Sequence, residues 1–109
     1  MQRKLDQFKR LSEIPQHSPV FTIAQKLVDV IKELDITHWC NVYTNNKRGL
    51  NIYLYANKFH TVFSIDLKGQ IDFIQDVYLE TITKEYNISL EEAIEEIKAF
   101  KASREQPPV

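Results

Sequence analysis

Three side chains near the middle of the chain are the candidates for metal binding or nucleophilic catalysis: His38, Cys40 and His60. His38 and Cys40 are two residues apart, so in a strand they point to the same face, whereas His60 has the opposite parity in its own strand. A stable zinc site takes four closely spaced ligands, and one cysteine with scattered histidines does not supply them. We therefore interpret Cys40 as a small buried residue and predict no metal or other cofactor.

Acid–base chemistry is the second possibility that the sequence raises. In an extended segment His60 shares a face with Asp66, and Asp72 and Asp76 follow further along the chain. A His–Asp pair can serve a hydrolase or a nuclease. However, both residues also fit exposed positions at strand ends, and the chain contains no G-x-S-x-G nucleophile motif. We therefore predict that the protein is not an enzyme.

An aromatic and polar pattern surrounds these residues between positions 38 and 67. From 50 to 57 apolar residues alternate with asparagines and tyrosines, which predicts a strand with one buried face. The other face and its flanking basic residues form the predicted partner-binding site. Its members are Trp39, Tyr43, Lys47, Arg48, Asn51, Tyr53, Tyr55, Lys58 and His60.

These residue types favour binding, because tyrosine, tryptophan and arginine bury large areas at low entropic cost and dominate binding hot spots. Two alternatives remain open for the tyrosines at this point. They can pack beneath a helix, or they can stabilise the sheet as cross-strand pairs.

The elements that position this face predict an α+β fold. Strands are expected at about 38–45, 50–57, 60–67 and 70–74, which form an antiparallel meander of three to four strands. Helices are expected at 3–14, 19–34, 75–87 and 90–102, packed mainly on one face of the sheet. Ser18 with Pro19 is typical of a helix start, and Ser89 with Glu92 forms a capping box.

The segment from 70 to 78 fits two structures. Ile71, Ile74, Val77 and Tyr78 have helical spacing, but the segment also follows a Lys68-Gly69 turn that is typical of a hairpin. We choose a strand from 70 to 74, followed by a helix that begins near Gln75.

Length and composition predict one ordinary globular domain over residues 1–109, with 103–109 as a flexible tail. The chain has 109 residues, a formal net charge of −1 and a single cysteine. One cysteine excludes an internal disulfide and fits a reducing compartment. The charged N-terminus and the lack of an apolar run of about 20 residues predict a cytoplasmic protein without membrane partners.

Two classes of function fit these observations. The first is a protein-binding module, for example an inhibitor or immunity-type protein that neutralises a toxin or an enzyme. The alternative is a single-stranded nucleic-acid-binding domain, which would stack bases on the sheet tyrosines and hold phosphates with the flanking lysines and arginine. The near-neutral charge favours the first class. A homodimer formed by strand pairing is a further expectation, if the strand at 50–57 lies at a sheet edge.

Overall fold

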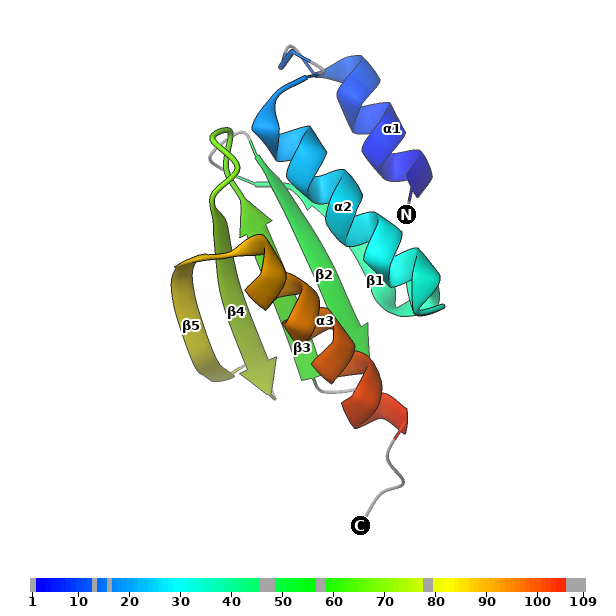
Figure 1. The fold of residues 1–109 in the computed structure, drawn as a ribbon, viewed down its shortest axis with the longest axis vertical. Coiled ribbons are helices and arrows are strands. Elements are labelled where there is room, and N and C mark those ends of the chain that lie inside the picture. Colours follow the sequence, from blue (N-terminus) through cyan, green and yellow to red (C-terminus); the bar gives the residue numbers. More distant parts are fainter. Residues whose placement is uncertain are drawn as a thin grey trace.

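The computed structural model describes residues 2–12, 14–15, 17–45, 49–56, 59–77 and 80–105. The helices form one layer and an antiparallel sheet forms the other (Figure 1). This arrangement confirms the predicted α+β class. In chain order the elements are α1 (Gln2–Leu11), α2 (Pro19–Glu33), the 3-10 helix η1 (Thr37–Trp39), β1 (Cys40–Thr44), β2 (Leu50–Ala56), β3 (Phe59–Ile65), β4 (Ile71–Val77), β5 (Glu80–Ile88) and α3 (Leu90–Glu105).

The ends of the helices follow from local residues. α1 ends at Leu11 rather than at the predicted residue 14, and Pro15 disfavours a helical conformation at Ile14. α2 begins at Pro19 as predicted, although the Ser18 side chain makes no capping hydrogen bond. At the start of α3 the capping box is present, since the Glu92 N–H donates to Ser89 Oγ at 3.0 Å. α3 continues to Glu105, beyond the predicted end at 102.

The sheet is a five-stranded meander in the order β1-β2-β3-β4-β5, and every pair is antiparallel. The predicted helix over 75–87 is wrong, because β4 continues to Val77 and β5 occupies Glu80–Ile88. The run Thr81-Ile82-Thr83 is β-branched and favours a strand. Pairing of this segment with β4 settles the conformation that the apolar spacing alone left ambiguous.

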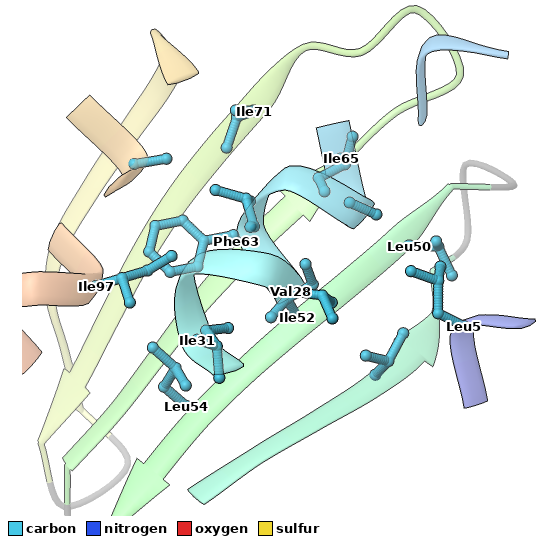
Figure 2. Packing of buried hydrophobic residues seen from close by; sticks show 14 of the residues in the cluster. Leu5, Val28, Ile31, Leu50, Ile52, Leu54, Phe63, Ile65, Ile71 and Ile97 are labelled. Carbon is cyan, nitrogen blue, oxygen red and sulfur yellow. The ribbon is translucent and has the colours of Figure 1, made fainter. Parts of the chain in front are cut away.

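One face of the sheet packs against the helices to form the core. Leu50, Ile52 and Leu54 of β2 are fully buried. Ile52 and Leu54 lie beside Val28 and Ile31 of α2, and Leu50 lies beside Leu5 of α1 (Figure 2). Figure 2 also shows Ile97 of α3 next to Phe63 of β3, and Leu5 of α1 near the β1 edge. The helices that the structure describes therefore all pack on the same side of the sheet.

α1 is joined to α2 by both polar and aromatic contacts. Gln2 Nε2 donates to Gln25 Oε1 at 2.8 Å, and Lys32 Nζ donates to Gln2 Oε1 at 2.6 Å. The rings of Phe8 and Phe21 meet edge to face with their centroids 5.9 Å apart. α1 is thereby held beside α2, at the β1 edge of the sheet.

The position of β2 decides which strands could pair with another chain. β2 is hydrogen-bonded to β1 on one side and to β3 on the other. Strand pairing through 50–57, the expected route to a homodimer, is therefore blocked. The edge strands are β1 and β5.

Gly49, just before β2, gives a test of this packing. Its φ is not positive, unlike that of Gly69, which is 86°. Instead Gly49 is needed for space, because a Cβ atom there would lie 1.8 Å from the Ile65 carbonyl oxygen. We expect Gly49→Ala to lower the free energy of unfolding by about 2 kcal/mol through overpacking, as measured by urea denaturation.

The matched control is Lys68→Ala, in the exposed β3–β4 turn. This change should alter stability by less than about 0.5 kcal/mol. Equal stability of Gly49→Ala and Lys68→Ala would contradict the close approach of Gly49 to β3.

Candidate functional site

The sheet face opposite the helices carries a grid of side chains that follows from the strand register. We call it the tyrosine face and define it by three rows. The middle row contains Asn41, Tyr53, Val62, Ile74 and Lys84, which are cross-strand neighbours. The row nearest the β1–β2 connection contains Tyr43, Asn51, Ser64 and Asp72. The row nearest the β2–β3 connection contains Tyr55, His60 and Asp76.

The tyrosine face is not covered by the described helices, which lie on the other side of the sheet (Figure 1). Tyr43 is 46% exposed and Tyr55 is 41% exposed. The alternative in which the tyrosines pack beneath a helix is therefore wrong. Cross-strand packing does occur, since the Tyr43 and Tyr53 rings meet edge to face at 5.3 Å.

Asparagines two residues away hold two of the tyrosine hydroxyls. Asn41 Nδ2 donates to the Tyr43 hydroxyl at 2.7 Å, and Asn51 Nδ2 donates to the Tyr53 hydroxyl at 3.3 Å. Side chains two residues apart in a strand share a face, so each pair forms within its own strand. Rings held in this way lose less conformational entropy when a partner binds.

Asn45 fixes the end of the β1–β2 hairpin beside this face, and sequence reasoning missed it. Its Nδ2 donates to Asn51 Oδ1 at 3.1 Å and to the Ile65 carbonyl at 3.3 Å. Its Oδ1 accepts from the Gly49 N–H at 2.9 Å. Asn45 thus connects three strands, a role that depends on contacts 20 residues apart and leaves no local signal.

The His60–Asp66 pair that the sequence raised as a possibility does not form. Asp66 lies in the β3–β4 turn, where its Oδ1 accepts from the N–H groups of Lys68 and Gln70, both at 2.9 Å. Aspartate side chains commonly bond backbone amides in turns in this way. The acid opposite His60 in the register is Asp76, whose Oδ1 is buried and has no hydrogen-bond partner among the described residues. His60 instead contacts Tyr55, with ring centroids 6.2 Å apart.

Charges of both signs occupy the tyrosine face and its borders. Lys4 Nζ of α1 donates to Asn41 Oδ1 at 2.7 Å and lies 4.5 Å from the centre of the Tyr43 ring. At the β5 side, a hydrogen bond with Tyr86 raises the pKa of Lys84. Two acids, Asp72 and Asp76, lie between these lysines on β4. The described charges are therefore balanced.

Trp39 does not belong to the tyrosine face. It ends the 3-10 helix η1, and its ring meets Phe100 of α3 edge to face at 6.0 Å on the core side. The predicted strand began at 38, but the 3-10 turn breaks the two-residue alternation before β1 begins at Cys40. Asn51, Tyr43, Tyr53, Tyr55 and His60 do lie together as predicted. Lys47, Arg48 and Lys58 lie outside the described residues.

Cys40 has the properties of a structural residue. Burial raises the pKa of its thiol to about 12, so the reactive thiolate is scarce at neutral pH. Within the described ranges, no group of three or more His, Cys, Asp or Glu side chains is placed to hold a metal ion.

The chain was also compared with known proteins. No family model matches it, and neither curated proteins nor solved structures give a significant match. Among the described helices, none is long and apolar enough to cross a membrane.

The raised pKa of Cys40 predicts slow alkylation of the folded thiol and a stability that depends on pH. The raised pKa means that the folded thiol stays protonated while an unfolded chain ionises near pH 9. The contribution of this thiol to the free energy of unfolding is therefore fully present below about pH 8.5. It decreases as the pH rises toward 12, by at most about 1.4 kcal/mol per pH unit. Urea denaturation between about pH 8 and 10 should show this decrease relative to Cys40→Ala.

Iodoacetamide labelling checks the same environment independently. At about pH 8 we expect little modification of the folded protein and rapid modification in urea, because only the unfolded thiol ionises appreciably. Equal labelling rates in both states would contradict a buried thiol.

Proposed function

We propose that this protein is a non-enzymatic protein-binding module whose partner docks on the tyrosine face. The observation that carries the proposal is the pair of exposed rings, Tyr43 and Tyr55, together with the half-buried Tyr53, on a face that the described helices do not cover. An aromatic patch with fixed rings and polar handles gives a large contact area at low entropic cost. The surrounding asparagines, Ser64 and the acids supply the polar contacts expected around an interface centre.

Several contacts favour a protein over single-stranded nucleic acid. Lys4 lies over the Tyr43 ring and Tyr53 meets that ring edge to face, which reduces the ring surface open to a stacking base. Asp72 and Asp76 would face the phosphates of a strand bound across β3 and β4. The net charge of −1 adds no long-range attraction.

An inhibitor or immunity-type protein that neutralises a toxin or an enzyme is the form of this proposal that we favour. The balanced charge and the small size suit a module that acts by covering another protein's surface. A toxin or nuclease gene next to this one in the genome would support this form directly.

Two exposed tyrosines offer a direct test of the docking face. We expect Tyr43→Ala with Tyr55→Ala to weaken binding to a partner at least tenfold, roughly the loss of a hot-spot side chain. The partner is captured from a lysate of the source organism with the wild-type chain, and its affinity is then measured by calorimetry. The variant should still unfold in one cooperative thermal transition, although it loses the contact of Tyr43 with Tyr53, because neither ring belongs to the buried core.

The control is Glu95→Ala with Lys98→Ala, an exposed ion pair on α3 in the other layer. This variant should bind the captured partner with unchanged affinity. If the tyrosine variant binds as well as the control, the tyrosine face is not the docking site.

Nucleic-acid binding is tested separately with a fluorescent single-stranded oligonucleotide. We expect negligible binding even at about 50 mM salt, because phosphate neutralisation would need more basic charge than the described face carries. The measurement is fluorescence anisotropy. Tight binding that weakens steeply between about 50 and 200 mM salt would favour the nucleic-acid-binding alternative instead.

A further inference from the structure

A groove runs between α1 and the edge strand β1, and Leu50 of β2 also lines it. We call it the edge groove and define it by Lys4, Phe8 and Leu11 of α1 with Val42 and Thr44 of β1. Its volume is about 280 Å³. Past Phe8 and Thr44 it continues into a hollow of about 530 Å³ bordered by Leu67. Figure 2 shows α1 beside the β1 edge, where Leu5 lies near Leu50.

The backbone of β1 turns hydrogen-bonding groups toward this groove. The Asn45 N–H donates to the Gly49 carbonyl at 3.1 Å, so the main-chain N–H of residue 45 points toward the β2 side of the hairpin. Alternate residues of an antiparallel strand bond in opposite directions, and Val42 and Thr44 therefore face away from β2. The Val42 N–H fits this pattern, because it donates to the Asn41 side chain at 3.0 Å rather than to β2.

We propose that the edge groove binds an extended polypeptide segment of a partner protein, which adds to β1 as a further strand. Strand addition needs an open edge for main-chain hydrogen bonds and pockets for alternate side chains. β1 supplies the edge, and the apolar groove between Phe8, Leu11 and Val42 supplies the pockets. This site differs from the docking face of the proposed function because it uses main-chain groups of β1, although Tyr43 borders both.

The charge beside the edge groove indicates which kind of polypeptide segment would bind there. Lys4 borders the groove, whereas Arg3 and Arg10 line a different hollow of α1 with Asp6, and Lys9 lies over the Phe21 ring on the α2 side. An acidic side chain next to the apolar ones would meet the positive charge of Lys4. Leu11, a large side chain that is 69% exposed beside the groove, would gain an apolar contact. The segment is therefore extended and apolar at alternate positions, with acidic residues toward the Lys4 end.

The free protein already covers part of this edge. Asn41 Oδ1 accepts from both the Val42 N–H and Lys4 Nζ, at 3.0 Å and 2.7 Å. A carbonyl of the added strand would replace Asn41 at the Val42 N–H. Thr44, which is exposed, offers its main-chain groups next to the larger hollow.

Proline at position 44 tests strand addition directly. Thr44→Pro removes an outward N–H, which an edge strand tolerates, whereas Thr44→Ala keeps it. The probe is a phage-displayed library of random linear peptides selected on the full wild-type chain, from which enriched peptides are synthesised. We expect acidic, alternately apolar sequences whose affinity falls about tenfold in Thr44→Pro and less than about threefold in Thr44→Ala, as for one lost main-chain hydrogen bond.

A second measurement needs no variant. In the wild-type protein, bound peptide should slow hydrogen exchange of the Val42 and Thr44 amides, which NMR resolves. The proposal is overturned if selection yields no binder, if exchange at these amides is unchanged, or if Thr44→Pro folds and binds as tightly as Thr44→Ala. It is also overturned if sedimentation shows a dimer that Thr44→Pro abolishes, since a second copy would then occupy the edge.

Discussion

The two-residue alternation of β2 is the constraint on which both surfaces of the sheet depend. Leu50, Ile52 and Leu54 are fully buried against the helices, and the intervening Asn51, Tyr53 and Tyr55 face the other way. A slip of one residue would place the polar and aromatic set in the core. The burial of the core residues therefore fixes the register, and that register puts the tyrosines on a face without a helix.

A sheet face without helices still needs shielding, and the tyrosines supply part of it. Val62 is only 6% exposed although it lies on the uncovered side, between Tyr53 and Ile74 in the register. Tyr53 therefore stabilises the sheet, whereas Tyr43 and Tyr55 leave more of their surface exposed. Cross-strand stabilisation and binding are thus divided among neighbouring residues of one face rather than being alternatives.

Features that neighbouring residues determine could be predicted from the sequence, whereas features that depend on distant contacts could not. β2, the start of α2 and the capping box of α3 follow from alternation and from neighbouring residues. The strand at Glu80–Ile88 was misread as helix because its pairing with β4 is a tertiary contact. Trp39 was misplaced because a 3-10 turn interrupts the alternation. The Asn45 bridge and the edge groove combine distant segments, which no local pattern reports.

The two edge strands of the sheet differ in the regularity of their register, and this difference favours β1 as a site for strand addition. β5 is irregular, with register shifts against β4, and carries the charged Lys84, both of which hinder edge pairing. β1 has a regular register with β2, and the cover described on its outer side is the Asn41 side chain, which bonds the Val42 N–H and Lys4. Tyr43 borders the edge groove and also belongs to the tyrosine face. A partner that laid one strand along β1 would therefore reach the tyrosine face next, so the two proposed sites can serve one interface.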